Sequence, residues 1–337
     1  MKKINQAMDE QFQTTKVQNA RRSNRLYDAK ILLESDISLE WKEAVELFLQ
    51  ARRTETESWS TVKLEEASLT YYARCMMEQK IEASIYHLTA EHFRNHFVQH
   101  MINKKYALNT INCRIKSIRR FFTFLNSEGW IEGNPTAGLK TRHGHRPTIH
   151  SLSKDQVVLL LDQPIKTIFT GFRDYAMMYL LLDTGLRVGE LVRLKLSQVD
   201  MKQGYLQQVI GKGRKPRDIP FCNEVRKVLQ KYLKARGELA DETLFVTLDG
   251  SYMHVRTFQE NLKEYGRKAG IENVRVSPHT LRHTFAKLYI LNGGDPYSLQ
   301  DILGHSSQDM VKNYLNLWQP EKKLQHTKAS PIRNLLR

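Results

Sequence analysis

Apolar residues recur at helical spacing through the first half of the chain, from Leu39 onward. The spacing predicts helices over about 39–51 and 59–79, and a third that begins after Thr89. A fourth helix, over about 108–125, has the clearest pattern, because apolar side chains three and four residues apart lie on one helix face. That face comprises Leu108, Ile111, Ile115, Ile118, Phe122 and Leu125. The first half therefore predicts a domain of four helices.

A second pattern begins at Ser153. Residues Ser153 to Gln156 have the form of a capping box ahead of an apolar run. A strongly apolar helix is predicted over 172–183, and Gly185 breaks it before another helix starts near Val188. Two strands, a third short strand and five further helices follow; they are predicted at about 204–210, 217–221 and Leu244–Thr247, and at 223–236, 255–269, 280–292, 297–303 and 308–318.

Three segments lack such patterning. Residues 1–38 are polar, include several Lys and Arg residues, and match no recognisable role. Residues 136–151 contain glycine, proline and basic residues with little apolar content, which is typical of a linker. The tail, 319–337, is polar and basic, although Ile332, Leu335 and Leu336 fit one apolar helix face. That face either packs on its own domain or binds a neighbouring copy.

The composition is that of a globular protein with a strong excess of positive charge. The formal net charge is +16 and the isoelectric point is near 9.6. We see no apolar run long enough to cross a bilayer and no apolar core of a secretory signal, so we expect a cytoplasmic protein without membrane contact. The three cysteines are far apart, which favours a reducing compartment over a disulfide framework. The charge indicates a polyanionic partner such as DNA.

Much of this charge is concentrated between residues 100 and 147, a stretch that contains nine Lys and Arg residues but two acidic residues. On the fourth helix, Lys116 and Arg119 share a polar stripe with Asn112 and Thr123. The stripe is either a solvated face or a surface that neutralises DNA phosphates. The predicted DNA contacts are Arg114, Lys116, Arg119, Arg120, Lys140 and Arg142, with Lys215 and Arg217 in the second half.

Five stretches of the second half carry side chains suited to phosphate chemistry. Arginine matches phosphate oxygens with a forked pair of donors and stays charged. The amino end of a helix favours anions, and one such end carries a His and an Arg three residues apart. His279 and His283 have the spacing of a zinc pair, but no third ligand accompanies them, so we predict no metal site. The candidate catalytic residues are Arg187, Lys212, His279, Arg282, His305 and Tyr314.

Each of these residues alone has an ordinary structural explanation, but their order is specific. The stretches TGLRVGEL, VIGKGRKPRDIP, SPHTLRHTFA and LGHSS, followed by Tyr314, resemble the tyrosine recombinase family of phage-type integrases and Xer-like recombinases. The resemblance is close over 153–316 and covers 39–135 in pattern only. It implies a mainly α fold with a small antiparallel β-sheet in the catalytic domain. It also implies a two-domain DNA clamp, with a helical, SAM-like core-binding domain at 39–135 and a catalytic domain at 152–318.

The resemblance also implies roles for these residues. Arg187 and Arg282 would hold the non-bridging oxygens of the scissile phosphate, and His305 would add a hydrogen bond. Tyr314 would attack to form a 3′-phosphotyrosyl link, without metal, ATP or any other cofactor. Lys212, with Lys215 as the second choice, would protonate the leaving oxygen. His279 would help to remove the proton from the phenol of Tyr314.

As partners, the resemblance implies a double-stranded recombination site, a homotetramer on two paired sites and room for an accessory DNA-binding protein. The resemblance also implies that the tail of this chain, 319–337, docks into a neighbouring protomer. Three alternatives remain open at this point: a type IB topoisomerase, a non-catalytic DNA-binding protein on the same fold and a zinc-dependent nuclease. The sequence does not distinguish integration, excision, dimer resolution or transposition, and it does not indicate a target site.

Overall fold

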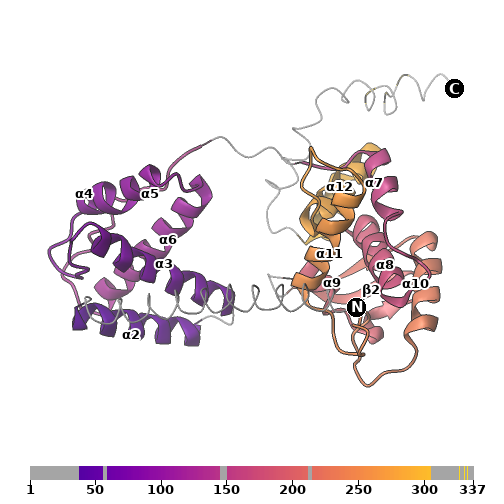
Figure 1. Cartoon of the computed structure of the whole chain (residues 1–337), viewed down its shortest axis with the longest axis horizontal. Helices are drawn as coiled ribbons and strands as arrows, with labels where there is room; N and C mark the ends of the chain where they lie inside the picture. Colours follow the sequence, from indigo (N-terminus) through magenta and orange to yellow (C-terminus); the bar gives the residue numbers. More distant parts are fainter. Residues whose placement is uncertain are drawn as a thin grey trace, which may run out of the picture. The chain divides into compact units, whose positions relative to one another are not determined.

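The computed structural model describes residues 38–55, 59–144, 150–211 and 215–304, together with positions 326, 330 and 332. The chain divides into two compact units, Met1–Arg146 and Pro147–Arg337 (Figure 1). Several predicted features lie outside the described residues: Lys212, His305, Tyr314, segment 1–37, the helix at 308–318 and nearly all of the tail. No helix among the described residues is both long enough and apolar enough to cross a membrane.

The first unit is helical, as its apolar pattern predicts. Its elements are α2 (Leu39–Glu55), α3 (Trp59–Glu78), the consecutive segments α4 (Ala90–His92), η1 (Phe93–Val98) and α5 (Gln99–Asn103), and α6 (Leu108–Ser127). The predicted apolar face of α6 is buried from Ile111 to Leu125. Trp41 of α2 stacks on Tyr72 of α3 with 4.9 Å between ring centroids. These aromatic contacts between helices form the core of the unit.

The second unit combines helices with a small antiparallel sheet. Its helices are α7 (Lys154–Leu161), α8 (Phe169–Thr184), α9 (Val188–Leu191), η2 (Leu196–Gln198), α10 (Asn223–Arg236), α11 (Val255–Lys268), α12 (Pro278–Leu291) and α13 (Pro296–Leu303). The apolar helix α8 packs against both α10 and α12 at the centre of the unit (Figure 1). The capping box at Ser153 is confirmed, since the Gln156 amide donates to its hydroxyl at 3.2 Å.

The sheet contains β1 (Val199–Asp200), β2 (Tyr205–Ile210) and β3 (Pro216–Pro220), in that order. Leu206 pairs with Ile219 and Ile210 with Pro216. Between these pairs a bulge places Gln208 at a φ of 53°. The sheet thus brings the two strands that flank residues 212–214 together in a defined register.

The strand predicted at Leu244–Thr247 is wrong. Within that stretch only Val246 forms a bridge, with Tyr252. Leu244, Phe245 and Val246 are fully buried in the core, so their apolar run reflects burial and not strand pairing. Strand β1 was not predicted, because two residues are too few to show an alternating pattern.

Gly185 fixes the junction between α8 and α9. It adopts a left-handed φ of 60° and donates its amide to Leu181 at 2.9 Å, which ends α8. A Cβ atom here would clash with the Phe285 ring of α12 and would lie 2.7 Å from Leu303 of α13. Since glycine has no Cβ atom, the end of α8 can lie close to α12 and α13 at this point. Arg187 lies two residues further along the chain.

Substitution of Gly185 tests this junction. Gly185→Ala should destabilise the second unit by about 2–4 kcal/mol, since backbone strain and overpacking add. Gly270 provides a matched control, because its φ is 66° and a Cβ atom added there would have no neighbour within 4 Å. Gly270→Ala should cost only about 1 kcal/mol. Urea unfolding of both variants measures the difference, and equal losses would contradict the close packing at Gly185.

Candidate active site

Arg187 is held in a defined orientation at the amino end of α9. Its backbone amide donates to Glu190 Oε2 at 2.9 Å, and its Nη1 donates to Glu190 Oε1 at 3.0 Å. Its Nη2 donates to the Gly304 carbonyl at 3.3 Å. The side chain nevertheless keeps 32% of its exposure. Arg187 is therefore preoriented while part of its guanidinium still faces solvent.

Glu190 is a buried carboxylate between two arginines. Its side chain is 2% exposed, and Arg217 of β3 also contacts it, at 2.8 Å from Nη2 to Oε2 and 3.3 Å from Nη1 to Oε1. Burial alone would raise the pKa of this carboxyl group, but hydrogen bonds from Arg217 and Arg187 outweigh burial and lower it. Glu190 is thus ionised and serves as the shared counter-ion.

Arg282 is the second arginine of the predicted pair. It lies near the start of α12, which begins at the Ser277 cap with Pro278 in the first turn. Its side chain is buried, and its donors reach the Gly185 carbonyl at 2.5 Å and the Leu303 carbonyl at 2.7 Å. Arg282 therefore links the ends of α8 and α13, the same ends that flank Arg187.

His279 is in the first turn of α12, close to both arginines. Partial desolvation, together with the positive charges of Arg282 and Arg187, lowers the pKa of its imidazole. The ring is consequently neutral at pH 7, which is the form that accepts a proton. Its ring stacks on that of His283 with 5.9 Å between centroids and 24° between planes. Burial lowers the pKa of His283 further, to about 4.

The structure thus brings together three of the predicted catalytic residues: Arg187, His279 and Arg282. Lys215 is exposed just before the sheet's last strand. Arg217, predicted as a DNA contact, has a side chain only 12% exposed and faces Glu190. Glu190 lies in the motif TGLRVGEL but is not among the residues predicted from the sequence. The signal was an acid three residues after Arg187, in the first turn of a helix.

The predicted DNA contacts in the first unit have mixed environments. Lys116, Arg119, Lys140 and Arg142 are exposed. Arg120 forms an ion pair with Glu65, a buried carboxylate that Arg52 also contacts at 3.1 Å. Arg114 lies over the Tyr71 ring at 3.4 Å.

The polar stripe of α6 is also partly engaged within the unit. Asn112 accepts from the Arg142 amide at 2.8 Å and donates to the Arg142 carbonyl at 2.9 Å. The Thr123 hydroxyl donates to the Arg119 carbonyl at 2.8 Å. The side chains of Arg119 and Lys116 remain the exposed cations of the stripe.

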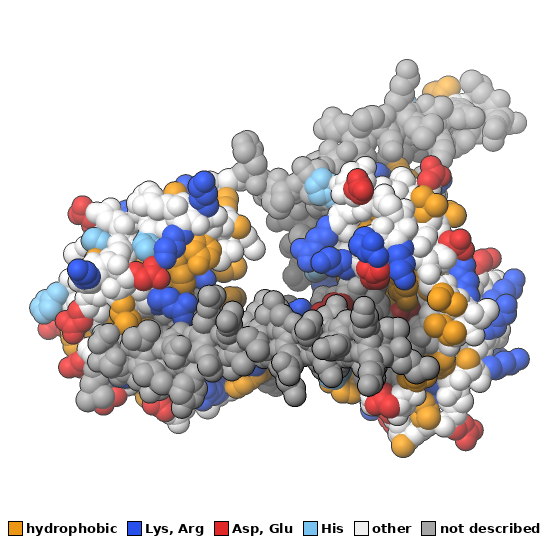
Figure 2. All heavy atoms as spheres, in the orientation of Figure 1, with side chains coloured by type: hydrophobic (Ala, Val, Ile, Leu, Met, Phe, Trp, Pro, Cys, Tyr) orange, Lys and Arg blue, Asp and Glu red, His pale blue; other side chains and the backbone are white. Residues whose placement is uncertain are grey.

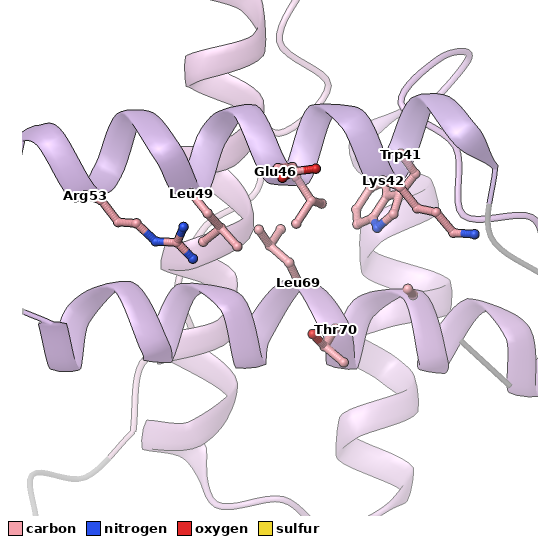
Figure 3. Close-up of a pocket in the computed structure, with 9 residues that line it drawn as sticks. Trp41, Lys42, Glu46, Leu49, Arg53, Leu69 and Thr70 are labelled. Carbon is pink, nitrogen blue, oxygen red and sulfur yellow. The ribbon is translucent and has the colours of Figure 1, made fainter. Parts of the chain in front are cut away.

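Two other surface features are seen among the described residues. A mainly apolar pocket of about 290 Å³ lies between α2 and α3. Leu49 and Leu69 face each other in this pocket (Figure 3). Figure 2 shows Lys and Arg side chains gathered on one face of the second unit, beside a histidine. Among the described residues, no three His, Cys, Asp or Glu side chains are grouped as metal ligands would be. The arginine, histidine and glutamate cluster is therefore the candidate active site.

A protein-family model matches the part of the chain in which these residues lie. The model of the phage integrase family matches residues 150–319, which include every predicted catalytic residue. The chain belongs to this family. The predicted membership among tyrosine recombinases is confirmed, and so is the mainly α fold with a small antiparallel sheet.

Similar proteins include tyrosine recombinases of the Xer type. XerC of Thermodesulfovibrio yellowstonii is 32% identical over 229 residues, which span 66% of this chain and 75% of that protein. XerD of Proteus mirabilis is 34% identical over 240 residues, 70% of this chain and 76% of that protein. A lambda integrase dimer bound to a COC′ core site shares the fold, with a TM-score of 0.67 and 18% identity, covering 80% of this chain and 96% of that one.

The recombinase therefore catalyses site-specific DNA recombination by the tyrosine recombinase mechanism. The prediction of a DNA strand transferase is confirmed at this level. The family assignment also decides against the type IB topoisomerase, the zinc-dependent nuclease and the non-catalytic DNA-binding protein.

The two stacked histidines predict a pH dependence of stability. Because both pKa values are lowered in the folded state, the unfolded chain binds more protons, and stability falls as pH decreases below the ordinary histidine value of 6.5. For His283 the fall extends to about pH 4. His283→Asn should therefore reduce the loss of unfolding free energy between pH 7 and pH 5. Urea unfolding at both pH values measures this, with exposed His150→Asn as the control. An unchanged slope in His283→Asn would contradict the environment described.

Proposed function

We propose that Arg187, His279 and Arg282 form the phosphate-binding part of the active site, and that Lys212, His305 and Tyr314 complete it. The observation that carries the proposal is the fixed orientation of both guanidinium groups at one junction of helix ends. Arg187 is held by Glu190 and Gly304, and Arg282 by Gly185 and Leu303. Donors fixed before the reaction stabilise a transition state without the cost of reorganisation.

The chemistry requires such fixed cations. A phosphodiester already carries one negative charge, and attack builds further charge on a five-coordinate phosphorus. Arg187 and Arg282 would neutralise the non-bridging oxygens, and His305 would donate a hydrogen bond to the same phosphate. An arginine suits this task because it remains charged throughout the pH range of the protein.

In the reaction that we propose, the Tyr314 oxygen attacks phosphorus while the bond from phosphorus to the 5′ oxygen breaks. His279 accepts the phenol proton, and Lys212 supplies a proton to the departing 5′ oxygen; Lys215 is the second choice for this role. The 3′-phosphotyrosyl bond conserves the free energy of the phosphodiester. The 5′ hydroxyl of a partner strand can then attack it and restore Tyr314, without ATP or metal.

The DNA recombination site is the partner that we assign to both units. The helical segment 39–135 would act as the core-binding domain, 136–151 as a basic linker and 152–318 as the catalytic domain. Two facts support this assignment: the fold is shared with integrases bound to DNA, and exposed cations are present in both units. The exposed candidates for phosphate contact are Lys116, Arg119, Lys140, Arg142 and Lys215.

We also propose a homotetramer on two paired sites, acting on nucleoid DNA in the cytoplasm. A pocket of about 460 Å³ in the second unit, with Leu182, Phe285 and Leu288 in its lining, is suited to an apolar helix face. The sequence of the tail, 319–337, predicts such a face, and we assign it to the corresponding pocket of a neighbouring protomer. Docking of this kind would couple the active sites of adjacent protomers.

Replacing either arginine tests the proposed site. Arg187→Ala and Arg282→Ala should each retain DNA binding but lose about 10²–10³ in cleavage rate, as expected for removal of one fixed donor. Single-turnover cleavage of a nicked duplex drawn from the DNA that flanks the protein's own gene gives the rate, and gel shift gives the binding. Wild-type cleavage by either variant would overturn the assignment.

The assembly proposal has its own test. Deletion of residues 328–337, or Leu288→Asp in the pocket, should weaken formation of paired complexes more than binding to a single site. Analytical ultracentrifugation with one-site and two-site DNA separates the two effects. Tyr297→Ser is a control, because Tyr297 is 69% exposed and does not line the pocket. Equal weakening of single-site and paired binding would count against docking.

A further inference from the structure

Arg217 connects three segments that meet at the active site. It lies on β3, its side chain is 12% exposed, and its Nη1 and Nη2 contact the two oxygens of Glu190. Its Nε donates to the Ile302 carbonyl, near the end of α13, at 2.8 Å. One buried guanidinium therefore joins the sheet, the α9 turn and the end of α13.

Two glycines leave room for this group. A Cβ at Gly211 would lie 2.9 Å from Glu190 Oε1 and 3.1 Å from Arg217 Nη1. A Cβ at Gly304 would lie 3.1 Å from the Arg217 guanidinium, and Gly304 has a φ of 62°. All three distances are shorter than the ordinary contacts of a Cβ atom. The backbone around Arg217 is thus shaped to admit a guanidinium that faces the protein and not the solvent.

Each oxygen of Glu190 receives one N–H group from each arginine. Oε1 accepts from Arg187 Nη1 and Arg217 Nη1, and Oε2 accepts from the Arg187 amide and Arg217 Nη2. Without Arg217, the buried carboxylate would have Arg187 as its remaining charged partner in this cluster. The carboxylate would then have two possible responses. It would bind Arg187 more tightly and withdraw this arginine from a substrate phosphate, or it would take up a proton and no longer hold Arg187 in place.

We propose that Arg217 is a positioning residue that acts on strand cleavage through Glu190 and Arg187. The inference rests on the proposed role of Arg187 at the scissile phosphate. It differs from the role first predicted for Arg217, a direct contact with DNA. A residue that binds a DNA phosphate lowers the salt dependence of binding when it is removed, whereas a positioning residue does not.

Substitution at Arg217 should consequently separate cleavage from binding. Arg217→Met and Arg217→Lys should slow single-turnover cleavage of the flanking-DNA duplex by about 10- to 100-fold, with the lysine variant less affected because it keeps the charge. DNA affinity and its dependence on salt should stay at wild-type values. Arg267→Ala is the matched control, since that arginine is 72% exposed in the same unit and pairs only with Glu264 among its described contacts. Its cleavage rate should be unchanged.

A neutral phosphate analogue distinguishes positioning from general loss of structure. Methylphosphonate at the scissile position removes one negative charge, so the reaction should depend less on the cation that neutralises it. Arg187→Ala and both Arg217 variants should therefore lose less rate on methylphosphonate than on phosphate DNA. Because both rates come from the same preparation, the ratio does not depend on the fraction of folded protein. The double variant of Glu190→Gln and Arg217→Met should be no slower than the slower single variant.

The outcomes distinguish failure of the role inferred for Arg217 from failure of the role proposed for Arg187. If Arg187→Ala shows the smaller loss on methylphosphonate but the Arg217 variants lose equally on both substrates, Arg217 is only structural and the inference is overturned. Losses that multiply in the double variant, or a lower salt dependence of binding, would overturn it as well. If Arg187→Ala itself loses equally on both substrates, the proposed role of Arg187 fails, and the inference fails with it.

Discussion

The proposed active site depends on a buried negative charge at Glu190. A carboxylate with 2% exposure is costly to desolvate, and it remains charged because Arg187 and Arg217 contact both of its oxygens. This arrangement holds a flexible arginine in one orientation while leaving part of it exposed to solvent. Arg282 is oriented by different means, through backbone carbonyls at the ends of α8 and α13. Both devices require close contact of helix ends, which Gly185 and Gly304 permit.

The positive charge of the chain therefore serves two purposes. Part of it is paired with buried carboxylates: Arg217 and Arg187 share Glu190, and Arg52 and Arg120 share Glu65. Another part is exposed, as at Lys116 and Arg119, and exposed cations can release counterions from DNA. Net charge and clustering alone do not separate the two kinds, because a buried ion pair and a phosphate contact use the same residue types.

Much of the fold follows from the sequence because its signals are local. The apolar face of α6, the capping box at Ser153 and the break at Gly185 each involve residues within a few positions of one another. Arg187, His279 and Arg282 were recognisable from the order of their motifs. The pairing of Arg217 with Glu190 was not recognisable, because it joins residues 27 positions apart and depends on the tertiary fold that brings Arg217 of β3 to Glu190 of α9. The buried run at Leu244 likewise showed apolar character, but not that its pairing would be limited to an isolated bridge at Val246.

If preoriented arginines present a scissile phosphate to Tyr314, then Tyr314 must carry the DNA after cleavage, and the decisive measurement is to identify the residue that does. Wild-type protein would be incubated with a nicked duplex from the DNA that flanks its gene, with and without EDTA, then quenched in detergent and analysed by peptide mass spectrometry. We expect a 3′-phosphotyrosyl adduct on Tyr314 in both conditions, and no adduct in Tyr314→Phe. An adduct on another residue, or one that forms only without EDTA, would show that the chemistry proposed for this site is wrong.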